Sequence, residues 1–153
     1  MASDGGMKIT CSVNLHGLEQ DLKEVGPKIG RRLFRKALKS VGQLWVEDLK
    51  FRVPVDEGDL RESIAASVTV RNKGKLTVGA VTCGPSYDKT SPRHGSGRTE
   101  NPGIYGLFVE FGLKKKLYKF TPFMRPTFDT TAERMVQVFA DGLREDLEAA
   151  LKD

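Results

Sequence analysis

The chain has 153 residues, enough for one domain whose core can form without disulfide bonds. Hydrophobic residues make up 39% of it and charged residues 29%, proportions within the range of globular proteins. The longest apolar runs fall far short of the ~20 residues that a membrane-spanning helix needs. The first residues lack the basic and apolar regions of a secretory signal, so we expect neither a membrane span nor a signal peptide.

The net charge of +5 is less than a dedicated nucleic-acid binder usually carries, but its distribution is uneven. Residues 28–39 and 114–125 contain basic and no acidic side chains, whereas the last residues are mainly acidic. Such a molecule can attract copies of itself head to tail, although ordinary solvated helix faces would show the same pattern. The basic residues are Lys28, Arg31, Arg32, Arg35, Lys36, Lys39, Lys114, Lys115, Lys116, Lys119 and Arg125, and the acidic ones are Asp141, Glu145, Asp146, Glu148 and Asp153.

The first elements follow a short leader at residues 1–6, which we expect to be flexible. Apolar and polar residues alternate over 7–15, which predicts a half-buried strand. Helical spacing over 18–25 predicts a short helix that Gly26 ends. An apolar stripe with a period near 3.6 then predicts a long amphipathic helix over 27–49, opened by Pro27.

A polar turn over 54–63 follows, and Asp59 is positioned to cap one helical turn there. Alternation predicts two strands over 64–70 and 76–80, joined by a hairpin loop that contains Gly74. Residues 84–103 show no core pattern and predict a mobile, functional loop.

The apolar run 104–111 is interpreted as the most buried strand. The last helix is predicted to begin near Asp129 or Thr130 and to carry an apolar stripe to Leu151. The order of elements predicts a single α+β domain over 7–153. In it, a small antiparallel sheet of about four strands is packed on one face by two long helices.

Catalytic patterns are missing from this sequence. No nucleophile elbow, phosphate-binding glycine loop or metal-ligand spacing is present, and His16 and His94 are far apart without ligand-type neighbours. Cys11 and Cys83 lie in strand-like segments and are interpreted as reduced, half-buried thiols, although a disulfide between adjacent strands is possible. We therefore expect no enzyme activity, no metal and no cofactor.

Three motifs together resemble a family of neck, head-tail joining and tail-completion proteins of long-tailed bacteriophages. Residues 54–63 read Pro-Val-Asp-Glu-Gly-Asp-Leu-Arg-Glu-Ser, 105–112 read Tyr-Gly-Leu-Phe-Val-Glu-Phe-Gly, and 122–126 read Pro-Phe-Met-Arg-Pro. The early segment 17–22 is similar to the family's leading Gly-Leu-x-x-Leu. The resemblance covers roughly residues 8–150, with Glu57 and Leu113 standing where the family usually has threonine.

The resemblance implies a virion structural protein without enzyme activity or cofactor. Members are thought to form a ring, of sixfold or twelvefold symmetry, that completes the tail or joins it to the head. The implied partners are head-completion or adaptor proteins and tail-tube or terminator proteins, with passing contact to genomic DNA. The implied location is the virion, and the host cytoplasm during assembly. A tail terminator or minor tail protein is the first alternative.

The motif residues are expected to keep the fold. Gly58 and Gly112 are candidates for positive φ. Glu110 is an acid within an apolar segment and needs a partner, for which Arg61 is the first candidate and Arg125 or a neighbouring subunit the alternative. The full set of expected structural residues is Pro54, Asp56, Gly58, Leu60, Arg61, Glu110, Gly112, Pro122, Arg125 and Pro126.

Assembly is expected to depend on two basic loops that become ordered on contact with partners. The candidate interface residues are Lys89, Arg93, Arg98, Lys114, Lys115, Lys116, Tyr118 and Lys119. Because aromatic residues interleave with lysines there, a small basic DNA-binding protein is the alternative from another functional class.

Overall fold

The computed structural model describes residues 22–54, 59–73, 76–85, 102–112 and 121–152. Two long helices, two strands and two short helices make up most of these ranges, and residues 22–24 are helical as well, within the short helix predicted over 18–25. In chain order they are α2 (Pro27–Arg52), α3 (Asp59–Glu62), β1 (Ile64–Lys73), β2 (Leu76–Pro85), α4 (Pro102–Phe111) and α5 (Met124–Lys152).

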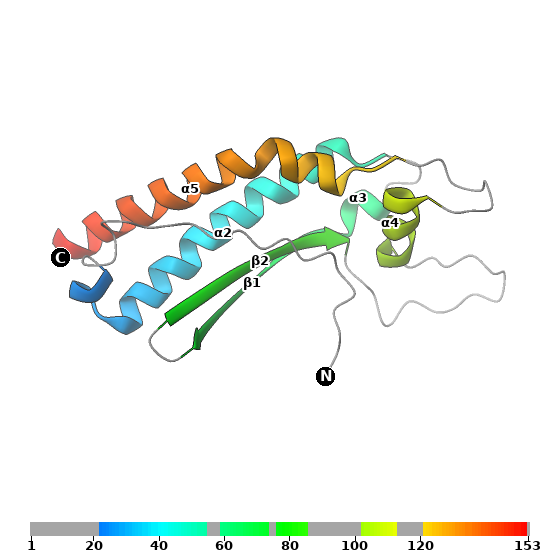
Figure 1. The fold of residues 1–153 in the computed structure, drawn as a ribbon. Coiled ribbons are helices and arrows are strands. Elements are labelled where there is room, and N and C mark those ends of the chain that lie inside the picture. Colours follow the sequence, from blue (N-terminus) through cyan, green and yellow to red (C-terminus); the bar gives the residue numbers. More distant parts are fainter. Residues whose placement is uncertain (1–21, 55–58, 74–75, 86–101, 113–120, 153) are drawn as a thin grey trace.

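Helix α2 is the central element of the fold. It packs against α5 and against both strands of the hairpin, and α4 contacts α3 and β2. Figure 1 shows α2 and α5 running antiparallel side by side, with the β1–β2 hairpin along α2 and the short helices α3 and α4 gathered at one end. That end, where α2 finishes and α5 begins, is called the α4 end below. The opposite end, where α2 begins and α5 finishes, is called the open end.

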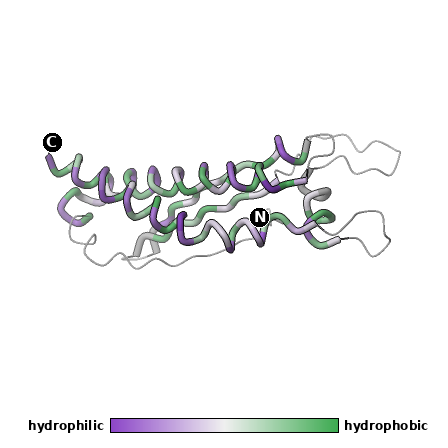
Figure 2. Tube along the Cα trace, turned by 90° about the horizontal axis from the view of Figure 1, so that it is seen from above, coloured by the Kyte–Doolittle hydropathy of each residue, from purple (hydrophilic) through white to green (hydrophobic). Residues whose placement is uncertain are grey.

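Helix α2 confirms the predicted helix over 27–49 and extends it to Arg52. Pro27 occupies the first turn, where its missing N–H costs nothing, after Gly26 at a φ of 84°. At the other end Val53 donates to the carbonyl oxygen of Leu49 at 2.9 Å, and Pro54 follows. Along both long helices hydrophilic and hydrophobic residues alternate as in other amphipathic helices (Figure 2).

The hairpin confirms the two predicted strands and lengthens both. Ile64 pairs with Pro85 and Lys73 with Leu76 in an antiparallel register. Ile64, Val70 and Cys83 are buried beneath α2, whereas Ser67 and Thr69 on the other face are exposed. The two-faced pattern follows from the period of two along a strand.

The predicted sheet of about four strands is not confirmed, because the described residues contain a single two-stranded sheet. The predicted strand 7–15 lies outside the described residues. The predicted strand over 104–111 is wrong, since Pro102–Phe111 is helix α4. In α4 the buried residues Gly106, Val109 and Glu110 recur at three- and four-residue spacing, which is one face of a helix and not of a strand.

Helix α5 begins at Met124, well before the predicted cap at Asp129 or Thr130. That prediction was wrong because the first turn is stabilised by a residue distant in sequence, as described below. The predicted apolar stripe is confirmed at Met135, Phe139, Leu143 and Leu147, which are buried, but not at Leu151, which is 46% exposed. Met124, Thr127 and Thr131 are further buried positions that the prediction did not include.

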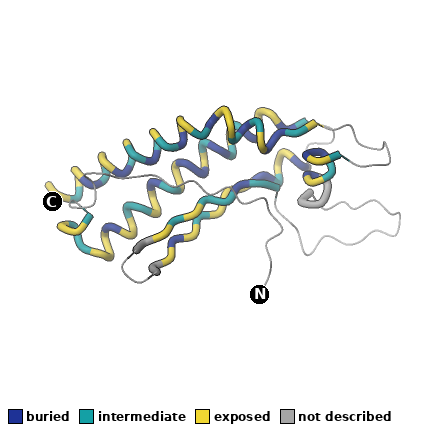
Figure 3. The backbone as a smooth tube through the Cα atoms, viewed as in Figure 1, coloured by how far each residue is buried: buried dark blue, intermediate teal, exposed yellow. Residues whose placement is uncertain are grey.

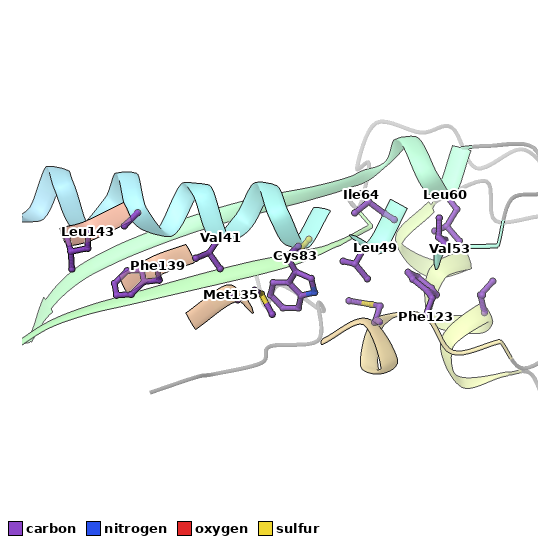
Figure 4. Packing of buried hydrophobic residues seen from close by; sticks show 14 of the residues in the cluster. Val41, Leu49, Val53, Leu60, Ile64, Cys83, Phe123, Met135, Phe139 and Leu143 are labelled. Atoms are coloured by element: carbon purple, nitrogen blue, oxygen red, sulfur yellow. The ribbon is translucent and has the colours of Figure 1, made fainter. Parts of the chain in front are cut away.

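The core runs the length of the molecule between the long helices and the hairpin. Figure 4 shows it as a band from Leu143 and Phe139, past Cys83 and Met135, to Leu60 and Phe123 at the α4 end. In Figure 3 the buried side of α5 faces α2 and its exposed side faces outward. Two contacts tie the helices further: the Phe34 and Phe139 rings meet edge to face at 5.4 Å, and Thr131 donates to Asp48 at 2.9 Å.

Two helical glycines should respond oppositely to alanine. At Gly106 an added Cβ would lie 2.7 Å from Pro85 Cγ and 3.2 Å from Leu60 Cδ1. Gly106→Ala should therefore lower the free energy of unfolding by about 1–2 kcal/mol, because the clash outweighs alanine's helix propensity. At Gly142 nothing lies within 4 Å, so Gly142→Ala should raise it by about 0.5–1 kcal/mol. Urea unfolding measures both, and a gain in both variants would contradict the close contact of α4 with β2.

Candidate assembly surfaces and the joint that positions them

A buried carboxylate joins α4 to the start of α5. Glu110 is only 4% exposed, and its Oε2 accepts hydrogen bonds from the backbone N–H of Phe123 at 2.7 Å and of Met124 at 2.9 Å. Its Oε1 accepts a third from the N–H of Arg125 at 3.2 Å. These three bonds are called the Glu110 joint below. A carboxylate in this position is also favoured by the positive end of the helix dipole.

The joint accounts for the backbone donors that a helix start leaves unpaired. The first four N–H groups of a helix have no partner within it. Glu110 takes three of them, and the fourth position is Pro126, which has no N–H to satisfy. The next donor, the N–H of Thr127, already bonds to the carbonyl oxygen of Phe123 at 3.3 Å. The motifs at 105–112 and 122–126 are therefore two halves of one capping device.

The predicted Arg61–Glu110 ion pair is wrong. Arg61 is exposed, and the described residues contain one salt bridge only, between Lys36 and Asp146. The alternative partner Arg125 does contact Glu110, but through its backbone N–H and not through its guanidinium. Backbone N–H groups at the start of α5, and not a cationic side chain, are the hydrogen-bond partners of the buried Glu110 carboxyl group.

The joint fixes α4 against the rest of the α4 end. Gly106 faces Pro85 and Leu60, and Val109 is 4% exposed and accepts a hydrogen bond from Thr121 N–H at 3.1 Å. The opposite side of α4 exposes Leu107 by 43% and Phe111 by 64%. Because these two residues are four apart, they form one apolar edge on a helix that is held rigidly.

The remaining motif residues support this end of the molecule. Leu60 is buried, Ser63 donates to the Leu60 carbonyl oxygen at 2.8 Å, and Pro54 is half-buried. Gly112 has the expected positive φ, 73°, but it ends a helix and not a strand. Pro122 is half-buried ahead of α5. Asp56 and Gly58 lie outside the described residues.

The predicted interface residues of the two basic loops also lie outside the described residues. They are Lys89, Arg93, Arg98, Lys114, Lys115, Lys116, Tyr118 and Lys119. In the sequence both loops adjoin α4, one before Pro102 and one after Gly112. Their role as partner contacts stays a prediction, because these residues lie outside the described ranges.

The charged segments of α2 and α5 are not at opposite ends of the molecule. Because the two helices are antiparallel, the basic first half of α2 and the acidic second half of α5 meet at the open end. Lys36 Nζ and Asp146 Oδ1 are 2.6 Å apart across the seam between them. The expected picture of a basic end and an acidic end is therefore wrong, and the molecule instead carries both charges side by side.

Cys83 is a free thiol with 2% exposure on β2. Burial raises its pKa to about 12, and a backbone hydrogen bond at Gly84 and the charge of Lys50 offset this only partly. Cys11 lies outside the described residues. Within the described part of the chain, no helix combines the length and apolarity needed to cross a membrane.

Comparison with known proteins gives one result. A family model described as HK97-gp10_like, "Bacteriophage HK97-gp10, putative tail-component", matches residues 17–112, more than half of the chain. The matched range holds the motifs at 54–63 and 105–112, including Glu110, and stops before the partner motif at 122–126. No curated protein and no solved structure matches the chain.

Proposed function

Because the chain belongs to the HK97-gp10-like family of bacteriophage tail components, we propose that it is a structural protein of the neck. Copies form a ring that completes the tail or joins it to the head. A ring is the closed arrangement that one repeated interface between identical copies produces. The family match carries the proposal, and it supports the virion as the place where the chain works.

The α4 end supports a role in contact with neighbours. Leu107 and Phe111 expose an apolar edge that the Glu110 joint holds in place from below. Large apolar side chains on a rigid element are typical of the centre of an interface. In the ring this edge faces a second protein of the head–tail connection, either a head-side adaptor or the tail tube and its terminator.

Electron microscopy of particles from a phage that lacks this gene tests the proposal. Separate filled heads and complete tails would support a role in joining them. Tails of irregular length would instead favour a tail terminator, and normal infectious particles would rule out both. Images of the purified protein bound to isolated tails would show whether it sits there as a ring.

A charged residue on the α4 edge should block assembly without unfolding the chain. We expect Phe111→Asp to lower the titre of infectious particles at least tenfold in a complementation assay, because a carboxylate in a buried interface is costly to desolvate. Its melting temperature should stay near that of the native protein, since Phe111 is 64% exposed in the monomer.

Val78→Asp is the control for this experiment. Val78 is 46% exposed on β2, in the half of the hairpin away from the α4 end, so its replacement should leave the titre unchanged. Equal losses in both variants would contradict a specific role for the edge. A Phe111→Asp variant with full titre would contradict any role for it.

A further inference from the structure

The open end carries two charged faces that the neck assignment does not explain. The first consists of Lys28, Arg32, Arg35 and Lys39 on α2 and is called the cationic face. The second consists of Asp141, Glu145 and Glu148 on α5 and is called the acidic face. All seven residues are exposed.

The cationic face is continuous and unneutralised. Its residues follow one another at spacings of four, three and four, which places them on one side of the helix along about 16 Å. Residues 25–46 contain no acid at all. Among the described residues these four cations have no salt bridge, in contrast to Lys36, which pairs with Asp146, and Arg31, which donates to the Val70 carbonyl oxygen at 3.0 Å.

The acidic face repeats the same spacing with the opposite sign. Asp141, Glu145 and Glu148 are four and three residues apart on the outward side of α5, along about 10 Å. Arg144 lies among them, but the segment from Asp141 to Lys152 still has four acids and two bases. The described residues provide no ion pair for these three acids.

The geometry points to a second copy of the chain as the partner: the cationic face of α2 in one copy docks on the acidic face of α5 in the next. This inference rests on the proposed function and names the surfaces through which copies meet. The Lys36–Asp146 pair shows that the two charge types already attract across the seam within one chain. The four cations of the cationic face lie on the side of α2 away from its buried positions, so acidic partners for them can come only from a second molecule.

Charge also sets how the copies are oriented. Two cationic faces repel each other, as do two acidic faces, so only the mixed contact is favourable. A single exposed ion pair contributes little, about 0–1 kcal/mol, and several must act together. The contact should therefore weaken steeply with salt, because the screening length falls from about 10 Å at 0.1 M to about 3 Å at 1 M.

Charge reversal in the 153-residue chain tests the inference by sedimentation at about 0.05 M and 0.5 M salt. The native protein should associate at low salt and dissociate at high salt. Arg32→Glu with Arg35→Glu should weaken association at least tenfold, and so should Glu145→Lys with Glu148→Lys. Acids near the start of α2 and bases near the end of α5 suit the helix dipoles, so both variants should fold.

Recovery of the contact is the decisive arm. The variant with all four reversals should associate again, because its reversed α2 meets the reversed α5 of the next copy. An equal mixture of the two single-face variants should also associate, because the reversed α2 of one variant meets the reversed α5 of the other. Arg52→Glu with Glu133→Lys is the control, because it reverses exposed charges at the other end of the same helices. Circular dichroism confirms folding in each case.

Three outcomes would overturn the inference. They are a native chain that stays monomeric at low salt, single-face variants that associate as well as the native chain, and an absence of recovery in the four-reversal variant. A basic face that instead binds duplex DNA would show salt-dependent DNA binding that only the α2 reversal removes. The neck role itself would survive any of these results, because particles from the deletion phage test it separately.

Discussion

Replacing Glu110 with alanine should lower the free energy of unfolding by about 3 kcal/mol or more. The substitution leaves the N–H groups of Phe123, Met124 and Arg125 without their acceptor; the first two are buried and the third is part-buried. A buried donor left unpaired costs about 1–3 kcal/mol. It also removes a negative charge from the positive end of a 29-residue helix. Urea denaturation followed by circular dichroism measures the loss.

Two further variants separate the cap from a general effect of losing an acid. Glu110→Gln keeps the shape but turns one acceptor oxygen into a donor that faces other donors, so it should lose about 1.5–3 kcal/mol. Glu133→Ala removes an exposed acid from α5 and should change stability by less than about 0.5 kcal/mol. Hydrogen exchange offers a local check, because the three amides should exchange much faster in Glu110→Ala. Unchanged exchange there would refute the joint.

The long helix and the hairpin could be predicted because their signals are local. Pro27, the apolar stripe and Pro54 define α2 without reference to anything else in the chain. The alternation on both sides of Gly74 likewise defines β1 and β2. In such elements propensity, periodicity and end signals all agree, which is when sequence reasoning is most secure.

Helix α4 could not be predicted with the same security. An apolar run of eight residues fits a buried strand as well as a buried helix, and periodicity does not separate the two. What decides the matter is tertiary contact: Gly106 must approach Pro85 closely, and Glu110 must reach the start of α5. For the start of α5 itself the sequence did offer a hint. Pro126 suits the first turn of a helix, because proline has no N–H group that would need an acceptor there.

The candidate surfaces show the same division. The basic residues of α2 and the acidic residues of α5 could be read from the sequence. That they meet at one end of the molecule depends on the antiparallel packing of the two helices, in which Lys36 pairs with Asp146. Arg61 was the wrong partner for Glu110 because the donors to its carboxylate are backbone N–H groups, which every residue except proline carries. A carboxylate can be satisfied by N–H groups thirteen to fifteen residues away, which no side-chain pattern records.

Alkaline pH should destabilise the protein through Cys83. Burial holds the folded thiol protonated to a pKa of about 12, whereas the unfolded thiol ionises near its ordinary value of 9.0. Below pH 9 both states carry the proton and Cys83 has no effect. Between 9 and 12 the unfolded state has lost a proton that the folded state keeps, so stability falls as the pH rises. The loss should reach about 1.4 kcal/mol at pH 10 and about 2 kcal/mol at pH 10.5.

Cys83→Ala isolates this contribution from lysines and tyrosines that titrate in the same range. The variant loses some core packing at every pH, about 1 kcal/mol, but it has no buried thiol to ionise. The unfolding free energy of the native protein minus that of the variant should therefore shrink as the pH rises from 8.5, reach zero between about pH 9.5 and 10, and be negative by pH 10.5. The sign changes where the ionisation of the unfolded thiol comes to exceed the lost packing. A difference that stays constant over this range would mean that water reaches the thiol in the folded state. In a Cys11→Ser background, reaction with a thiol-reactive dye is an independent measurement, since Cys83 at 2% exposure should react only as the chain unfolds.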